Sequence, residues 1–408
     1  MENLLNQLAP MKTGAELLSE MTVLPAYDPN IRAQPSTVRL MALSDLYNIY
    51  IPSSMSVEIY SKLYLALLRS LQKKEGITAQ IQRNENHKRI IQRESNSILG
   101  GSDSFTLIGC SGIGKSTAIN RAIDMITEKK LLENAYTKII PCLIVQCPFD
   151  CSPKGLLLEI LRQADTFLNS DYYLKAMKNR VTTDMLLGNV AQIALNHIAL
   201  LIVDEIQNVV GHKNGKSLVS LLTQLINSSG ISICMVGTPE CAIFFEQAMQ
   251  LARRALGLYY NAVEYGQFFY DFCATLFQYQ YVKNQTELSD SIVRWLYDHG
   301  GGIISIVVSL IHDAQELAIL NGTETLNLDT LNEAYTKRLT MLHRYISLPS
   351  KPIIPRKKKS EPPVPTVEVE EKAVLDEKIS DIVSMAKEQN RDIVSFLQAK
   401  IKIEVITI

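Results

Sequence analysis

Short apolar runs alternate with helical patterns through the middle of the chain. Runs rich in strand-forming residues occur at 104–108, 139–146, 198–203 and 231–236, and residues 257–264 can supply one further strand. Segments with apolar residues at helical spacing lie between them, at 117–126, 153–167, 183–197 and 216–228. Alternation of this kind predicts an α/β fold, in which helices cover both faces of a parallel sheet. We place this core at residues 96–265.

The pattern becomes helical throughout from about residue 267. Helical spacing of apolar residues covers 267–279, 286–299, 302–320 and 327–345, and Gly300, Gly301 and Gly302 separate two of these segments. Residues 266–347 are therefore predicted to form a small all-α domain that follows the core.

The N-terminal part precedes the core as two segments. Pro25, Pro29 and Pro35 interrupt the first, which predicts an irregular arm over residues 1–50 rather than an independent domain. Residues 51–95 are predicted to be helical. Ser53 or Ser54 can cap the first helix, and a second, polar helix covers 78–95.

The C-terminal part divides into a linker and a tail. The linker, residues 348–365, is rich in proline and carries the basic run 356–359, so it cannot bury enough surface to fold alone. In the tail, residues 366–408, apolar side chains recur at alternating spacings of four and three, which predicts an amphipathic helix. Such a helix either docks on its own body or binds a partner.

Composition permits a large core and no general affinity for polyanions. Of the 408 residues, 47% are hydrophobic and 20% charged, and the formal net charge is −1, so any contact with nucleic acid must come from a local basic surface. The seven cysteines lie mostly in apolar runs without metal-ligand spacing, which indicates buried thiols in a reducing compartment. Because no leader pattern and no membrane-length apolar run are found, we expect a cytoplasmic protein without a membrane partner.

A glycine-rich loop follows the first predicted strand and opens a predicted helix. It consists of Gly109, Cys110, Ser111, Gly112, Ile113, Gly114, Lys115, Ser116 and Thr117, and it fits the phosphate-binding pattern G-x-x-x-x-G-K-[ST]. The glycines allow successive backbone N–H groups to turn toward an anion. Lys115 can reach the β- and γ-phosphates, and the Ser116 hydroxyl can ligate Mg²⁺. We therefore predict ATP and Mg²⁺ as cofactors.

A second motif ends the third predicted strand. Four apolar residues, 200–203, run directly into Asp204 and Glu205, which is the Walker B arrangement. The strand would bring Asp204 to the Mg²⁺ ion, partly through water, and Glu205 could polarise the attacking water. The two motifs together predict a slow, regulatory ATPase. A protein that binds ATP and barely hydrolyses it remains open at this point.

Two further features resemble AAA+ ATPases. Thr238 ends the strand that we expect between the two motif strands, where AAA+ proteins place a residue that senses the γ-phosphate; the alternative is a strand-ending turn. Arg253 and Arg254 lie on a predicted helix where AAA+ proteins carry an arginine finger; the alternative is a surface charge pair. A finger acts on the nucleotide of a neighbouring subunit, so it would require head-to-tail assembly.

The second sensor arginine of AAA+ lid domains has no clear counterpart. The segment after Gly302 offers Ser305 and no nearby arginine. Arg294 and Arg338 would be guesses for this role. Nucleotide-driven motion of the lid is therefore in doubt at the level of sequence.

The combined motifs resemble TnsC and TniB, AAA+ regulators of target selection in DNA transposition, including CRISPR-associated transposons. The resemblance covers roughly residues 50–345 and rests on the phosphate loop, the strings at 147–156 and 250–254, Asp204-Glu-Ile-Gln207 and Gly237-Thr-Pro-Glu240. The N-terminal arm and the tail are more similar to TnsC. The resemblance implies an AAA+ core with a helical lid and ATP-dependent assembly, as a ring or helical filament, on double-stranded DNA. It also implies a TnsD- or TniQ-type target-selection protein and a transposase as partners, and we expect the tail to bind the transposase.

Family members contact DNA largely without sequence preference, through basic residues on an inner surface. The candidates here are Lys154, Lys175, Lys178 and Arg180, which lie on segments able to face a pore. Phosphate contacts by these residues would give salt-dependent affinity. The alternative for each of them is a solvated surface charge.

Two other functional classes share part of this pattern. A signalling or scaffold NTPase of the STAND type would use the tail as a protein-interaction arm without DNA, although the chain lacks the long sensor region usual for that class. A helicase loader or replication initiator would carry a winged-helix domain after the lid, and the sequence offers a linker and one tail helix there instead.

Overall fold

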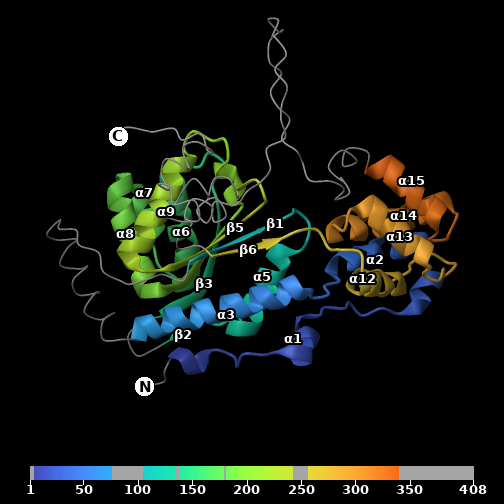
Figure 1. The fold of residues 1–408 in the computed structure, drawn as a ribbon, viewed down its shortest axis with the longest axis horizontal. Coiled ribbons are helices and arrows are strands. Elements are labelled where there is room, and N and C mark those ends of the chain that lie inside the picture. The colour runs from blue at the N-terminus through green and yellow to red at the C-terminus, as the bar shows by residue number, and fades with distance from the viewer. Residues whose placement is uncertain (1–3, 76–103, 134–137, 179–180, 242–255, 340–408) are drawn as a thin grey trace, which may run out of the picture. The chain divides into compact units, whose positions relative to one another are not determined.

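The computed structural model describes residues 4–75, 104–133, 138–178, 181–241 and 256–339 (Figure 1). Six strands form one sheet in the order β2-β3-β4-β5-β1-β6. Their bounds are β1 (Phe105–Gly109), β2 (Leu132–Glu133), β3 (Lys138–Gln146), β4 (Ile198–Asp204), β5 (Ser232–Gly237) and β6 (Leu256–Tyr260). All neighbours are parallel except β2 and β3. The predicted α/β class is confirmed, and β5 lies between the two motif strands as expected.

The strand register brings the two motifs to one edge of the sheet. Gln146 pairs with Asp204, and Ile108 pairs with Gly237. The carboxyl ends of β1, β4 and β5 therefore lie together, which is where open parallel sheets bind ligands.

Helices cover both faces of this sheet (Figure 1). One face packs against α3 (Ser54–Glu75) and α5 (Lys115–Thr127). The other packs against α6 (Pro153–Leu168), α8 (Thr183–His197) and α9 (Gly215–Ser229), with α7 (Tyr172–Lys178) beside α6. The strands read as near-continuous apolar runs because both of their faces are buried.

Four helices form the lid that the sequence predicts: α12 (Gln267–Gln278), α13 (Asp290–Gly300), α14 (Ile304–Asn321) and α15 (Leu328–Arg338). They enclose a separate apolar core. Among the described residues α14 alone has the length and apolar composition of a membrane span. Its buried side chains, including Leu310, Ile311 and Leu317, fill the lid core, which accounts for that composition.

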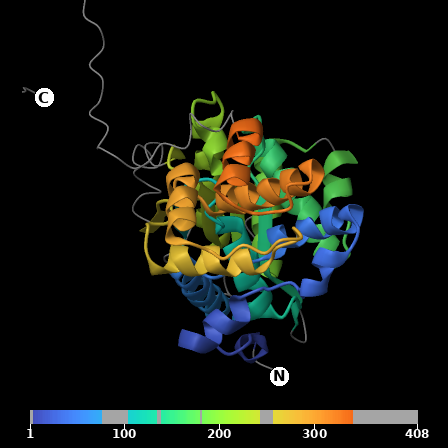
Figure 2. The ribbon, with the colours of Figure 1, turned by 90° about the vertical axis from the view of Figure 1, so that its right-hand side faces the viewer.

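Residues 4–51 pack into both cores rather than lying along one surface. This segment contains η1 (Leu4–Gln7), α1 (Gly14–Met21), η2 (Pro29–Ala33), α2 (Ser36–Ala42) and η3 (Leu43–Asn48). Leu4, Leu17 and Met21 join the core of α3 and α5, whereas Leu43 and Leu46 join the lid core. Figure 2 shows the ribbon from the side on which the lid helices face the viewer. The prolines that suggested an irregular arm separate short helices, and each helix buries its apolar face against a different neighbour.

Arg39 fixes the second half of this segment to the lid. Its guanidinium is 1% exposed and donates to both carboxylate oxygens of Glu324 at 2.7 Å. It also donates to the carbonyls of Gln34 and Tyr281, at 3.0 and 2.9 Å. These four hydrogen bonds give the buried cation its acceptors, and they link two parts of the chain that are distant in the sequence.

The cysteines are free thiols, and all except Cys110 are buried. Burial raises the pKa of Cys142 to about 12, so this thiol stays protonated at neutral pH. The predicted helix at 78–95, Arg180, the pair Arg253 and Arg254, the linker and the tail lie outside the described residues.

Candidate functional site

The phosphate loop joins β1 to α5 in the conformation that its glycines permit. Gly112 and Gly114 have φ values of +80° and +94°, in the left-handed region where a Cβ is strained. Gly114 is the N-cap of α5, and Lys115 is its first residue. The loop therefore stands at a helix N-terminus, where backbone N–H groups and the helix dipole favour an anion.

The Lys115 side chain folds back onto the start of the loop. Its Nζ donates to the carbonyls of Gly109 at 2.6 Å and Cys110 at 2.8 Å. Burial lowers the pKa of Lys115, and the nearby Asp204 carboxylate acts in the opposite direction. A partly desolvated ammonium with only carbonyl partners is prepared to exchange them for phosphate oxygens.

The Walker B acids stand opposite the loop. Asp204 ends β4, and its Oδ2 accepts a hydrogen bond from Ser116 Oγ at 3.2 Å. Its Oδ1 accepts from the backbone N–H of Glu205 at 2.8 Å. A hydroxyl and a carboxylate this close offer two hard oxygen ligands, the type that Mg²⁺ prefers. Ser116 and Asp204 therefore fit the predicted magnesium site.

Glu205 and Thr238 line the same cavity, and each forms a hydrogen bond with a nearby side chain. Glu205 has a left-handed backbone (φ +58°), and its carboxylate accepts a hydrogen bond from the side chain of Gln207. Thr238 follows β5 and donates to the carboxylate of Glu240. Gln207 was not predicted as a site residue; it lies on η4 (Ile206–Val209), and its Oε1 is buried without a partner among the described residues.

These residues line one cavity of about 600 Å³. Its wall contains the phosphate loop from Ser111 to Thr117, with Asp204, Glu205 and Thr238. Concave sites of this size are typical of small-molecule and cofactor binding. The structure thus brings Lys115, Ser116, Asp204, Glu205 and Thr238 together at one place.

The cavity also has walls that the sequence motifs did not indicate. Tyr50, Ser53 and Ser56 come from the segment before and at the start of α3, and Arg121 comes from α5. Tyr50 donates to Ser56 Oγ at 2.8 Å, and burial raises the Tyr50 pKa. Arg121 donates to the Glu20 carbonyl at 2.9 Å, while its buried Nε has no partner among the described residues. Only the helical spacing from Thr117 could have suggested Arg121, because residues four apart share a helix face.

The lid reaches the phosphate loop through the start of α14. The Ser305 N–H donates to the Gly112 carbonyl at 3.0 Å, and a Cβ on Gly112 would overlap Ser305 Oγ. The two arginines considered for the second sensor role are engaged elsewhere and do not line the cavity. Arg294 pairs with Asp298 at 3.2 Å, and Arg338 pairs with Glu316 at 3.5 Å.

Three of the four predicted DNA contacts, Lys154, Lys175 and Lys178, lie on α6 and α7, on the other side of the sheet from α5. Lys154, in the first turn of α6, donates to the Val181 carbonyl at 3.0 Å. Lys175 pairs with Asp171 at 2.6 Å on α7, and Lys178 is exposed at the end of that helix. Their role as DNA contacts stays a prediction.

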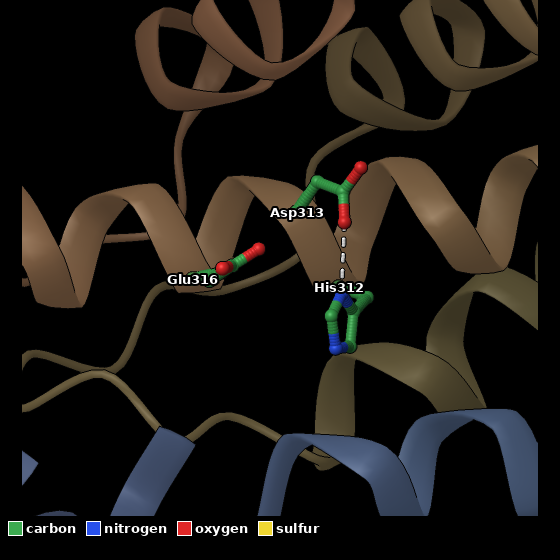
Figure 3. A group of neighbouring side chains, drawn as sticks. All are labelled: His312, Asp313 and Glu316. Carbon is green, nitrogen blue, oxygen red and sulfur yellow. Dashed lines mark hydrogen bonds and ion pairs between the residues drawn. The ribbon is translucent and has the colours of Figure 1, made fainter. Parts of the chain in front are cut away.

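One cluster of potential metal ligands occurs elsewhere among the described residues. His312, Asp313 and Glu316 project from α14 (Figure 3). His312 Nδ1 and Asp313 Oδ1 are 2.8 Å apart, and the His312 ring packs against Tyr47 at 4.7 Å between centroids. Glu316 faces Arg338, so each of these groups already has a partner within the lid and its neighbouring N-terminal segment.

The comparisons with known proteins agree with this architecture. Residues 99–243 match the family model described as an AAA domain. The AAA+ part of the sequence resemblance is thereby confirmed, and the matched segment holds the phosphate loop, Asp204, Glu205 and Thr238. No curated protein matches the sequence.

Two solved structures share part of the fold at low similarity. One is the Orc1 protein of Aeropyrum pernix in complex with DNA, with 14% identity, a TM-score of 0.41, and coverage of 67% of this chain and 69% of that one. The other is Drosophila ORC bound to DNA, with 13% identity, a TM-score of 0.40, and coverage of 83% and 72%.

Proposed function

We propose that this protein is an ATP-hydrolysing AAA+ regulator that oligomerises on double-stranded DNA and links target selection to a transposase. The observation that carries the ATPase part is the contact between Ser116 Oγ and Asp204 Oδ2 inside a cavity that also contains Lys115, Glu205 and Thr238. Two separate sequence motifs contribute to that contact, and a chance glycine-rich turn would not bring them together.

The residues of the cavity have separate tasks in this proposal. Lys115 exchanges the carbonyls of Gly109 and Cys110 for phosphate oxygens, and the loop N–H groups hold the remaining charge. Ser116 and Asp204 would hold Mg²⁺, which would supply positive charge to offset that of the phosphates. Glu205 leaves Gln207 and orients the attacking water, which makes it the general base. Thr238 leaves Glu240 and bonds the γ-phosphate, so it reports the nucleotide state.

The lid senses the nucleotide through backbone rather than through an arginine. Ser305 donates its N–H to the phosphate loop at Gly112, and Ser305 also lines the cavity. If the loop tightens around phosphate, the Gly112 carbonyl would shift, and the start of α14, which is bonded to it through Ser305, would shift with it. In this proposal, Ser305 occupies the place where other AAA+ lids use a second sensor.

The DNA, oligomer and transposition parts rest on the sequence resemblance to TnsC and TniB. Asp204-Glu-Ile-Gln207 and Gly237-Thr-Pro-Glu240 are the strings that distinguish this subtype. Arg253 and Arg254 would act on the nucleotide of the next subunit, and a TnsD- or TniQ-type protein and the transposase would bind opposite sides of the assembly.

Two variants test the proposal. We expect Lys115→Ala to abolish ATP binding and assembly, and Glu205→Gln to bind ATP, assemble on DNA and fail to hydrolyse. Nucleotide binding and phosphate release measure the ATPase part. Electron microscopy with duplex DNA and a non-hydrolysable ATP analogue measures assembly. Particles that remain monomeric and free of DNA, together with normal hydrolysis, would overturn the DNA part and leave the ATPase part standing.

A further inference from the structure

One arginine of the nucleotide cavity lacks an anionic partner among the described residues. Arg121, on α5, lines the cavity, and its buried Nε has no hydrogen-bond acceptor there. Its Nη2 donates to the Glu20 carbonyl at 2.9 Å. That bond satisfies one donor but does not neutralise the positive charge. Because a buried N–H without an acceptor is costly, this position favours a ligand that supplies one.

The acids next to Arg121 are paired with other residues. Asp124, three residues further along α5, pairs with Lys129 at 3.3 Å. The Glu20 carboxylate bonds the Lys12 ammonium. Within the described part of the chain, Arg121 forms no ion pair. Four other arginines each pair with a carboxylate: Arg39, Arg162, Arg294 and Arg338.

Helix geometry directs Arg121 toward the phosphate loop. Thr117 and Arg121 are four residues apart on α5, so their side chains share one face of the helix. Long side chains on a helix lean back toward its N-terminus, and the N-cap of α5 is Gly114 of the phosphate loop. Both Thr117 and Arg121 line the cavity. The guanidinium is therefore placed to serve an anion that is bound at the first turn of α5.

The wall beside Arg121 offers hydroxyl groups and no acid. Ser53 and Ser56 line the cavity at the start of α3, whose first turn contains no acid. Tyr50 donates to Ser56 Oγ at 2.8 Å, and the Ser53 N–H donates to the same oxygen at 3.1 Å. Burial raises the pKa of Tyr50, whereas the Ser56 hydrogen bond and the Arg121 charge act in the opposite direction. This wall is therefore suited to negative charge.

The charges of the cavity leave one part of the nucleotide without a cation. Four charged side chains line the cavity among the described residues: Lys115, Arg121, Asp204 and Glu205. In the proposed function, Asp204 would hold Mg²⁺ and Glu205 orients water. Lys115 serves the β- and γ-phosphates. Arg121 has no task there, and the α-phosphate has no cationic partner.

We propose that Arg121 is a further nucleotide-binding residue, which contacts the α-phosphate of ATP. The inference rests on the proposed ATPase function and assigns a residue that its motifs do not mark. The contact would use the Nε–H that lacks an acceptor, while Nη2 keeps its bond to Glu20. A ribose hydroxyl could also accept from Nε, but it would leave the charge of Arg121 unpaired.

This role differs from that of the γ-phosphate residues. ATP and ADP both carry an α-phosphate, so Arg121→Ala should weaken both by the same factor. We expect about 10- to 150-fold, the range for a hydrogen bond to a charged group. Because hydrolysis does not change the α-phosphate, KM for ATP should rise by that factor at unchanged kcat. Calorimetry measures the two affinities, and phosphate release measures kcat and KM.

The two diastereomers of ADPαS identify the contacted group. In each, sulfur replaces one oxygen of the α-phosphate, and sulfur accepts hydrogen bonds weakly. At least one diastereomer should bind the wild type less tightly than ADP does, and Arg121→Ala should lose most of that difference. A general distortion of the cavity would weaken ADP and ADPαS alike and leave the difference between them unchanged.

Two further variants complete the test. Asn120→Ala removes an exposed neighbour on α5 that does not line the cavity, and it should bind ATP like the wild type. Arg121→Lys keeps the charge without the planar fork, so it should lose part of the affinity and part of the ADPαS difference, even if alanine destabilises α5.

The outcomes separate this inference from the proposed function. If the wild type binds and hydrolyses ATP while Arg121→Ala and Arg121→Lys bind ATP and ADP equally well, the inference fails and the ATPase stands. It fails likewise if the ADPαS difference is absent in the wild type or survives unchanged in both variants. If the wild type does not bind ATP, the proposed function itself fails.

Discussion

The buried ion pair between Arg39 and Glu324 predicts a large loss of stability when one partner is neutralised. In Glu324→Gln, two charge-assisted hydrogen bonds of 2.7 Å lose their anionic acceptor, and the guanidinium remains 1% exposed. The carbonyls of Gln34 and Tyr281 still accept from Arg39, but neither neutralises its charge. Removing one partner of a buried pair costs about 3–5 kcal/mol, and we expect a loss in that range.

The chain supplies a matched control on the same carboxylate. Lys283 Nζ lies 3.8 Å from Glu324 Oε1, but the Lys283 side chain is 60% exposed. An exposed pair contributes about 0–1 kcal/mol, so Lys283→Ala should change the free energy of unfolding by no more than that. The comparison tests burial, because each variant removes one charge from an ion pair that Glu324 forms, with buried Arg39 in one case and exposed Lys283 in the other.

Urea unfolding followed by tryptophan fluorescence measures both variants. Trp295 is the only tryptophan and lies on α13, stacked on His299 at 4.0 Å between ring centroids, so its emission reports the lid. The urea concentration at the midpoint of unfolding should fall strongly in Glu324→Gln and little in Lys283→Ala. The slope of the free energy of unfolding against urea concentration should be similar in both variants. If Glu324→Gln lowers the free energy of unfolding by less than about 1 kcal/mol, as the control does, the reasoning that burial makes this ion pair indispensable is refuted.

The pH dependence gives a second test of the same pair. The Arg39 hydrogen bonds, more than any other cause, lower the pKa of Glu324 from its ordinary value of 4.5. The folded state therefore binds this proton less readily than the unfolded state. The stabilisation is complete above the ordinary pKa and is lost as the pH falls through the lower folded value. Glu324→Gln should abolish that component of the acid sensitivity.

Three further predictions concern the cavity. Gly112→Ala should weaken ATP binding and loosen the lid, because φ at this position is +80° and the new Cβ would overlap Ser305 Oγ. Calorimetry measures the ATP affinity, and the control Gly188→Ala, at an open helical position, should bind ATP normally. Asp204→Asn should reduce the dependence of ATP affinity on Mg²⁺ by removing an anionic ligand, which a magnesium titration measures. ATP affinity should fall as the pH rises through the lowered pKa of free Lys115, since the complex favours the charged form; binding titrations at a series of pH values measure this slope.

The parts of the site that follow from local sequence could be predicted. A phosphate loop must follow a strand and open a helix, and the pattern around Gly109 and Lys115 contains all three signals. Asp204 ends an apolar run that is long enough for a buried strand. The resemblance to AAA+ proteins predicted that β5 lies between the two motif strands, which is why Thr238 was selected before the sheet order was known.

The remaining walls of the cavity carry no local signal. Tyr50 reaches it because residues 27–51 fold onto the lid, a contact between parts of the chain that are more than 200 residues apart, as in the bond from Tyr27 to the Gln280 carbonyl. Arg121 looks like any helical surface arginine until Glu20 and Tyr50 are placed beside it. Ser305 was passed over because an arginine was expected there, whereas its contribution comes from a backbone N–H that every non-proline residue possesses.

The N-terminal segment explains how the cavity can respond to its occupant. Residues before Thr22 belong to the core of α3 and α5, whereas Leu43, Leu46 and Ile49 belong to the lid core. The two halves meet at a bridge in which Val23 and Tyr50 exchange backbone hydrogen bonds of 2.8 and 2.9 Å, and both residues line the cavity. A shift of the lid relative to the phosphate loop must therefore alter this bridge or the contact of Ser305 with Gly112. Because both contacts border the space proposed for ATP, we expect nucleotide binding and lid position to be coupled through the backbone, without need of a second sensor arginine.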